Sequence, residues 1–387
     1  MSLLMIPGPI EVSPAVIEAG SGKPPGHLAA SFIEAFGRSL EQMRVIWKAG
    51  ADSQPFLVAG SGTLAMEMAA TNVVDPGEPV VVVQTGWFSD RMAEMARRRG
   101  ARVTVVGSPP GETPSLDDIA AAMSKTRAKV LFATHVDTST GVRCDAAAYA
   151  ALATEHGALS VFDGVCATAA ERFDMEAWGA DIYLTGSQKA IGLPAGLALL
   201  VASPRALDKR SRLAVAPPMT MDFESWLPIM LSYEARGKGY FATPATSLVK
   251  ALPVAFDELL SEDGIEGCFA RHQRGADAFR AAWAAMGLSL VATRPELAAN
   301  TLSAVRYPSG VGAALVAQIA ERGVVVAGGL HPEIKTEYFR VGHMGDVLRR
   351  PDALELTVRA IADALTAEGH ATDADAAWKA FSDVFDG

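Results

Sequence analysis

The sequence predicts an α/β protein with a three-layer αβα large domain, built around a mainly parallel sheet, and a smaller α+β domain after it. Continuously apolar runs alternate with segments of helical periodicity from residue 54 onward, a pattern typical of strands covered by helices on both faces. The chain has 387 residues, of which 50% are hydrophobic, and this is enough to build a large core and two domains.

The elements of the large domain follow one another regularly. An extended N-terminal segment with Pro7-Gly8-Pro9 and Ser13-Pro14 precedes a helix predicted over 33–48. Apolar runs predict strands at 56–59, 80–84, 102–106, 130–134, 158–162, 181–185 and 196–202, and helices between them at 64–73, 91–99, 116–123 and 146–156. In such folds, ligands bind at the carboxyl ends of the strands.

A Pro- and Met-rich connection over 211–228 ends the alternation. Beyond it we predict helices at 246–260, 265–286, 312–322 and 351–368, and strands at 301–306, 324–327 and 338–341. The alanine-rich tail after Glu368 is expected to fray. We place the domain boundary at 262, so that residues 1–262 form the large domain and 263–387 the small one, on which about the first 20 residues pack.

Composition and charge exclude several classes of function. The net charge of -10 disfavours a nucleic-acid or anionic-membrane partner. The three cysteines lack CxxC or metal-ligand spacing, which indicates a reducing compartment without disulfides and no metal site. The first apolar run stops at Pro7, too short for a signal peptide, and no later run could span a membrane. The expected location is therefore the cytoplasm.

One lysine lies where lysines are uncommon. Lys189 occupies a Gly/Ser/Pro-rich turn between the apolar strands predicted at 181–185 and 196–202. Desolvation between core strands lowers the pKa of an amine and makes it a usable nucleophile, as in Schiff-base lysines. Taken alone, the stretch fits a surface lysine on a loop equally well.

Other polar groups follow neighbouring strands. Gly60-Ser61-Gly62-Thr63 stands before a helix, where free N–H groups favour one phosphate, unless Thr63 merely caps the helix. Asp163 either caps a turn or holds a proton on a heterocyclic nitrogen, and Trp87 or Phe88 either stacks on such a ring or belongs to the core. One cofactor needs all of these groups together with a lysine. It is pyridoxal 5′-phosphate (PLP).

Residues 185–190, Thr-Gly-Ser-Gln-Lys-Ala, followed by Pro194-Ala195-Gly196, resemble the cofactor-lysine signature of the class V aminotransferases of PLP fold type I. The similarity is greatest to the alanine–glyoxylate and serine–pyruvate or serine–glyoxylate branch, and it extends from Pro7 to the helix near Pro351. It implies that Lys189 is the Schiff-base lysine. It further implies a set of cofactor-binding residues: Ser61, Gly62 and Thr63 for the phosphate, Phe88 and Val165 for the ring faces, Asp163 for the ring nitrogen, and Thr138 and Gln188 as further contacts.

The resemblance also reaches the assembly and the substrate. It implies a homodimer in which Tyr240 and Thr243 contact the phosphate of the neighbouring subunit, and an Arg340 that binds the substrate carboxylate. The chain departs from the family at Thr63, where some relatives have histidine, and at residues 27–32, which lack an arginine found in many relatives. These departures leave the amino donor open.

The expected function is a ping-pong transamination from alanine or serine to glyoxylate or pyruvate. The alternatives within the family are an unusual donor, such as pyridoxamine, ureidoglycine or an aminophosphonate, and a desulfurase or lyase reaction. A desulfurase needs a cysteine on a mobile loop after the lysine, whereas Cys268 falls in a predicted helix. Outside the family, the alternative is a non-enzymatic or nucleotide-binding αβα protein with a structural Lys189.

Overall fold

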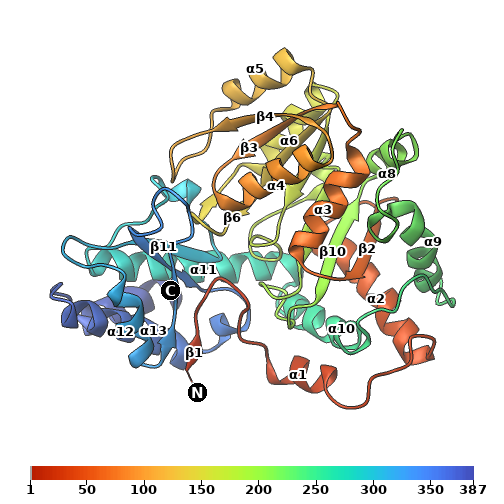
Figure 1. Cartoon of the computed structure of the whole chain (residues 1–387). Coiled ribbons are helices and arrows are strands. Elements are labelled where there is room, and N and C mark those ends of the chain that lie inside the picture. The colour runs from red at the N-terminus through yellow and green to blue at the C-terminus, as the bar shows by residue number, and fades with distance from the viewer. Residues whose placement is uncertain (1) are drawn as a thin grey trace.

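A seven-stranded sheet organises the larger part of the molecule (Figure 1). The structure is a computed structural model that describes residues 2–387, so Met1, within the predicted domain of residues 1–262, lies outside the described residues. The strands, in spatial order, are β2 (Gln54–Ala59), β10 (Leu197–Ala202), β9 (Ile182–Gly186), β8 (Leu159–Asp163), β5 (Val130–Thr134), β3 (Pro79–Gln84) and β4 (Arg102–Gly107). Only β10 runs antiparallel to its neighbours, which confirms the mainly parallel sheet.

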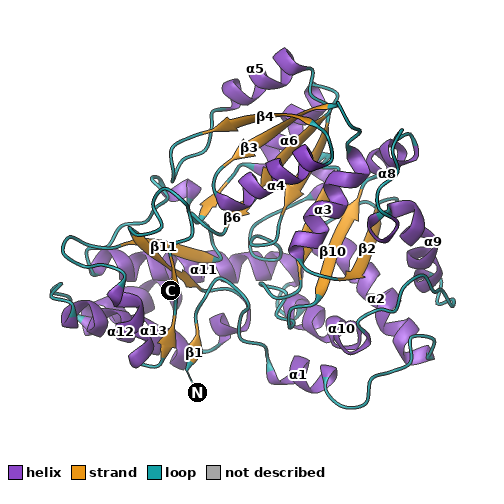
Figure 2. Ribbon diagram, viewed as in Figure 1, coloured by secondary structure: helices purple, strands orange, loops and turns teal. Residues whose placement is uncertain are grey.

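Helices cover this sheet on both faces, as the three-layer prediction requires (Figure 2). The helices of this part of the molecule are α2 (Ala30–Trp47), α3 (Gly62–Val73), α4 (Trp87–Arg98), α5 (Leu116–Thr126), α6 (Ala146–Glu155), α7 (Met175–Trp178), α8 (Pro204–Ser211), α9 (Phe223–Glu234) and α10 (Thr246–Leu260). Several begin at a side chain that accepts a bond from the first turn, such as Ser115 before α5 and Asp145 before α6. A two-stranded ribbon, β6 (Val136–Asp137) with β7 (Val142–Arg143), follows β5.

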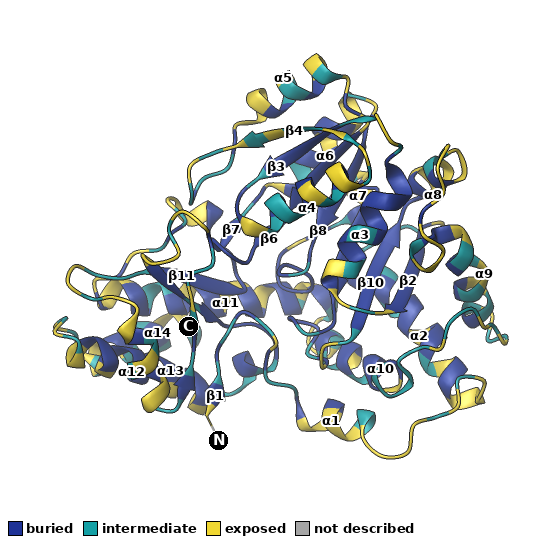
Figure 3. Ribbon diagram, viewed as in Figure 1, coloured by how far each residue is buried: buried dark blue, intermediate teal, exposed yellow. Residues whose placement is uncertain are grey.

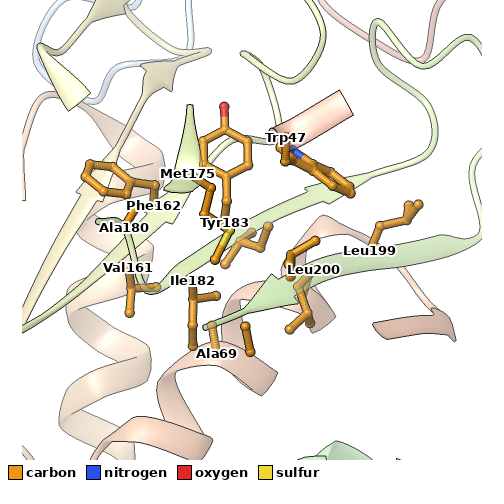
Figure 4. Close-up of a cluster of buried hydrophobic side chains, with 14 of the residues drawn as sticks. Trp47, Ala69, Val161, Phe162, Met175, Ala180, Ile182, Tyr183, Leu199 and Leu200 are labelled. Atoms are coloured by element: carbon orange, nitrogen blue, oxygen red, sulfur yellow. The ribbon is translucent and has the colours of Figure 1, made fainter. Parts of the chain in front are cut away.

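The central strands are buried along their whole length (Figure 3). Their apolar side chains pack with those of α2 and α3. Figure 4 shows Trp47 of α2 near Tyr183 of β9 in this cluster. Continuous burial is the reason that these strands were readable from the sequence as uninterrupted apolar runs.

The smaller part of the molecule is an α+β unit. Its antiparallel sheet has the order β11 (Leu302–Arg306), β14 (Tyr338–Gly342), β13 (Ala327–Gly328), and its helices are α11 (Gly264–Ala285), α12 (Ala314–Glu321), α13 (Pro351–Ala367) and α14 (Ala374–Phe385). The N-terminal strand β1 (Leu3–Leu4) pairs in parallel with β12 (Val324–Val325) of this unit.

Two main hydrophobic clusters correspond to these two parts. The first half of α11 packs into the larger cluster and its second half into the smaller one, which also holds Leu3 and Met5. Because α11 belongs to both clusters, a boundary at residue 262 stays a prediction. No helix among residues 2–387 is both long and apolar enough to cross a membrane.

Three local predictions were wrong. The tail after Glu368 forms α14, because Ala377 and Phe381 are fully buried against the small domain. The connection over 211–228 contains the first half of α9, which tolerates Pro228 because the helix buries Trp226 and Met230. The N-terminal segment is not extended throughout: Ser13 caps a helix, α1 (Pro14–Gly20), with Pro14 in the first turn, where proline is favoured.

Candidate active site

The loops after the sheet strands meet around one cavity of about 210 Å³. It lies at the carboxyl ends of β2, β3, β5, β8 and β9, where ligands of such sheets bind. Nine of the predicted site residues line it: Ser61, Gly62, Thr63, Phe88, Thr138, Asp163, Val165, Gln188 and Lys189. These nine residues, Lys189 among them, come from five separate chain segments and share one cavity.

Lys189 lies in the turn between β9 and β10. Ser187 closes this turn, because its hydroxyl donates to the Pro194 carbonyl at 2.8 Å and accepts from the Leu197 N–H at 3.2 Å. The side chain of Lys189 is buried, and its amine donates to the carbonyl of Pro7. Burial lowers the pKa of Lys189, and the nearby positive charge of Arg340 acts in the same direction. The alternative of a surface lysine is wrong for this residue.

Asp163 ends β8 at the bottom of the cavity. Its carboxylate accepts a hydrogen bond from the Val165 N–H at 2.9 Å, and the side chain is buried. Burial raises the pKa of Asp163 to about 7, although the Val165 N–H opposes that rise. A carboxyl of this kind is well suited to share a proton with a basic nitrogen placed beside it.

The N-terminus of α3 forms the opposite wall. Ser61 precedes the helix in an extended conformation, and its side chain makes no capping bond. Thr63 lies inside the first turn and does not cap the helix, so the purely structural reading of this turn is wrong. A Cβ on Gly62 would come within 2.5 Å of the Val165 side chain, so only glycine allows this close approach. The free N–H groups of the first turn favour an anion here.

The cavity fits PLP in its donor and acceptor groups. The side-chain oxygen of Gln188 is buried at the cavity and has no hydrogen-bond partner within residues 2–387. A buried orphan acceptor is costly, and a bound group with a donor would satisfy it. The helix N-terminus suits a phosphate, Asp163 suits a ring nitrogen, and Lys189 suits an aldehyde, so the residues present match each end of the cofactor.

A buried carboxylate, that of Asp137, fixes the aromatic wall of the site, which is formed by Phe88. Asp137 accepts hydrogen bonds from the N–H groups of Phe88, at 3.1 Å, and Ser89, at 3.2 Å, at the start of α4. A Cβ on Gly86 would lie 2.6 Å from the carboxyl carbon of Asp137. The sequence did not single out Asp137 as a positioning residue, although Thr138 beside it was expected to contact the cofactor.

Arg340 lies on the small domain, where it does not line the cavity but bonds to Thr138, which does. On β14, its Nε donates to the Gly328 carbonyl at 2.9 Å and one terminal nitrogen donates to the Thr138 carbonyl at 3.2 Å. Burial lowers the pKa of Arg340, and no carboxylate within residues 2–387 pairs with it. A half-buried guanidinium bonded only to neutral carbonyls is prepared to bind an acid.

Tyr338 holds this arginine strand against the large domain. Its buried hydroxyl donates to the Ser139 carbonyl and accepts from the N–H groups of Leu330 and His331, each at 2.9 Å. These bonds join β14, a small-domain loop and the loop that carries Thr138. This role of Tyr338 could not be predicted from the sequence, because the three segments are far apart in the chain.

Like Arg340, the predicted residues Tyr240 and Thr243 do not line the cavity. Tyr240 is 60% exposed, and its hydroxyl lies 3.2 Å from that of Thr243. Thr243 lines a separate cavity of about 240 Å³ beside Trp226 and Tyr233. Within one chain, the structure therefore does not bring this pair to Lys189.

The cavity also contains residues that the sequence did not single out: Gly8, Met66, Val136 and Cys166. Gly8 approaches so closely that an added Cβ would lie 2.6 Å from the Lys189 side chain. Cys166 was considered only for disulfides and metals, and its Sγ lies 3.7 Å from the Thr301 hydroxyl. Pro7-Gly8-Pro9 was a visible motif, but only the fold brings it to the lysine.

Comparison with known proteins finds aminotransferases that are similar to this chain over nearly its whole length. The model of the family described as Aminotransferase class-V matches residues 22–349. Alanine–glyoxylate aminotransferase 1 of Saccharomyces cerevisiae is 38% identical over 357 residues, covering 88% of this chain and 91% of the relative. L-aspartate–glyoxylate aminotransferase of Paracoccus denitrificans is 35% identical and covers 94% and 91%. Among solved structures, pyridoxamine–pyruvate aminotransferase of Mesorhizobium loti matches with a TM-score of 0.92 at 27% identity, covering 99% and 97%.

Proposed function

The chain belongs to the class-V aminotransferase family, and from this premise we propose that it transfers the amino group of a small amino acid, alanine or serine, to glyoxylate or pyruvate, with PLP as its cofactor. It is a transaminase, as the yeast and Paracoccus relatives are named. The observation that carries the cofactor assignment is the buried Lys189 in one cavity with Asp163 and the free N-terminus of α3.

Different residues of the cavity would hold different parts of the cofactor. The N–H groups and hydroxyls of Ser61 and Thr63 would hold the phosphate, Phe88 and Val165 would cover the ring faces, and Asp163 would keep a proton on the ring nitrogen. Thr138 and Gln188 offer further polar contacts. When bound, PLP supplies an electron sink for the pair left behind as the substrate Cα loses its proton.

Lys189 and Arg340 act on the substrate. The guanidinium of Arg340 binds the α-carboxylate through two parallel hydrogen bonds and so orients the Cα–H bond. Because burial lowers its pKa, Lys189 is available as a neutral amine that takes the proton from Cα of the substrate and delivers it to C4′ of the cofactor. Gly8 and Pro7 cover the amine and limit the access of water to it.

The other functions considered above are less well supported. Cys268 is fully buried in α11 with its pKa raised by burial to about 11, so it is neither mobile nor a ready nucleophile for a desulfurase. The family match excludes a non-enzymatic αβα protein with a structural lysine. An unusual donor is not favoured, because the curated relatives with the highest reported identity are glyoxylate aminotransferases of ordinary amino acids.

A half-reaction screen tests the proposed function. The PLP-loaded protein is mixed with alanine, serine or aspartate, one at a time, and both the loss of its visible absorption and the release of the matching oxo acid are followed. Alanine or serine should convert the protein rapidly, and glyoxylate or pyruvate should then restore the starting spectrum. Conversion by aspartate alone would replace the proposed donor, and no conversion by any of the three amino acids would contradict the proposed substrate class.

Replacing Arg340 with lysine should raise the KM for both the amino acid and the oxo acid by about 10- to 100-fold, because one charge remains but the paired hydrogen bonds are lost. Steady-state kinetics with each substrate varied in turn would measure this effect. Arg306→Lys, on the neighbouring strand β11 and paired with Glu337, is the matched control. An unchanged KM for both substrates would remove Arg340 from the carboxylate site.

We further propose a homodimer in which Tyr240 and Thr243 reach the phosphate in the neighbouring subunit. Their exposure and distance from the cavity of their own chain support this arrangement. Hybrid dimers of Lys189→Ala chains with Tyr240→Ala/Thr243→Ala chains should recover activity, because one of the two composite sites is then intact. If the pair acts within its own chain, the hybrid will be no more active than its parents.

The cytoplasm is our proposed compartment. Its support is limited to the three cysteines, which are all unpaired thiols, as a reducing environment allows. Fractionation of the source cells, with the protein detected by antibody, would test this location.

A further inference from the structure

We propose that Arg91 provides the positive charge that binds the phosphate of the cofactor. This inference rests on the proposed function, because it assumes that PLP occupies the cavity. Arg91 does not itself line the cavity, and neither the motif nor the sequence resemblance singled it out. Its contacts, however, are with two residues that do.

The guanidinium of Arg91 lies against the wall that would receive the phosphate. One of its terminal nitrogens donates to the Thr63 hydroxyl at 3.3 Å, and Thr63 belongs to the first turn of α3. Its central carbon lies 5.2 Å from the centre of the Phe88 ring. The Thr63 side chain therefore connects the guanidinium to the first turn of α3, where the N–H groups are free.

The start of α4 explains this placement. Asp137 fixes the first turn of α4 through the N–H groups of Phe88 and Ser89. Arg91 follows Phe88 by three residues, and side chains at this spacing lie on the same face of a helix. The carboxylate that positions the aromatic wall therefore also directs the arginine toward the cavity.

The site needs a cation at this end. The only lysine or arginine that lines the cavity, among the described residues, is Lys189, and its amine is directed to the Pro7 carbonyl. Arg340 is held on the side of Thr138. A phosphate carries between one and two negative charges near neutral pH, and an arginine is well suited to bind it.

Arg91 is also free to take an anionic partner. No carboxylate within residues 2–387 lies close enough to Arg91 for an ion pair, whereas Arg97 and Arg98 on the same helix both pair with Glu94. Burial raises the pKa of Asp163, and the charge of Arg91 opposes that rise, so the guanidinium is within electrostatic reach of the cavity.

The test compares two ligands that differ only in the phosphate. Cofactor-free wild-type protein, Arg91→Gln, Arg91→Lys and the control Arg98→Gln are titrated with PLP and with pyridoxal, and binding is followed by visible absorption. We expect Arg91→Gln to weaken PLP binding by about tenfold or more and to leave pyridoxal binding unchanged. Arg91→Lys should restore most of the affinity, and Arg98→Gln should match the wild type.

Two results would overturn the assignment. Equal losses for PLP and pyridoxal in Arg91→Gln would mean that Arg91 acts only by supporting Phe88. Unchanged PLP binding, with or without a rise in the KM of an amino acid, would mean that the phosphate does not need this charge. Failure of the wild-type protein to bind PLP would instead contradict the proposed function, so the two failures are distinguishable.

Discussion

Replacing Lys189 with alanine should lower the turnover number by about 10⁴-fold or more, the largest effect that we expect of any single substitution. The side chain is the only amine that lines the cavity among residues 2–387, and burial lowers its pKa. Alanine removes both the group that joins the cofactor and the group that moves the Cα proton. The surrounding turn should survive, because Ser187 closes it independently of the lysine.

The measurement combines kinetics with chemical labelling. Wild-type protein reduced with borohydride in the presence of PLP should carry the cofactor on the peptide that contains Lys189, and Lys189→Ala should carry none. Lys250→Ala, an exposed lysine on α10, is the control and should keep full activity and full labelling. Label on another lysine, or activity of Lys189→Ala within tenfold of wild type, would contradict the assignment. Thermal melting of the variant would establish that it is folded.

The strands of the sheet were predictable because they are buried on both faces. In β5, β8, β9 and β10 nearly every residue before the carboxyl end of the strand is apolar or small, and this signal survives in the sequence without any knowledge of their neighbours. The order of strands and helices then placed Ser61, Phe88, Asp163 and Lys189 at one edge. The family resemblance supplied the individual roles, which periodicity alone left open.

The helices that the sequence missed depend on tertiary packing. The helix α14 is alanine-rich and looks unstable alone, but it docks Phe381 into the small domain. In α9 the proline argues against a helix, yet Trp226 and Tyr233 gain enough by burial to retain it. Local propensity could not predict either outcome, because the stabilising contacts come from distant segments.

The residues that position the site could not be predicted from the sequence, for the same reason. Asp137 fixes Phe88, Tyr338 holds the strand of Arg340, and Arg91 reaches Thr63, each across a wide gap in sequence. None of these residues has a distinctive local pattern. Their roles follow only from hydrogen bonds and buried contacts between segments that the fold brings together.

Replacing Asp163 with asparagine should have two opposite effects, a loss of activity and a gain in the stability of the cofactor-free protein. Asparagine does not carry the charge that holds a proton on the ring nitrogen, so turnover should fall by about 10²- to 10³-fold. The side chain is nearly isosteric, and it can still accept the hydrogen bond from the Val165 N–H. The activity loss should therefore arise without disruption of β8.

The stability effect follows from the direction of the pKa shift. Burial raises the pKa of Asp163 from its ordinary value of 3.8 to about 7, so the folded protein favours the neutral acid. The stability that this group contributes is full below about pH 4 and is lost as the pH rises through 7. At pH 8 the free energy of unfolding of cofactor-free Asp163→Asn should thus exceed that of the wild type by about 2–4 kcal/mol.

Thermal melts of the cofactor-free proteins between pH 4 and pH 8 would separate these effects. The wild-type melting temperature should fall relative to that of Asp163→Asn across this range, while the exposed control Asp52→Asn should follow the wild type. Parallel curves for wild type and Asp163→Asn would show that the carboxyl is not held neutral in the empty site. A stabilised but nearly inactive variant would mean that the ionised Asp163 carboxylate lowers the stability of the cofactor-free protein. It would also mean that the same carboxylate is needed for activity, where bound PLP is proposed to neutralise its charge.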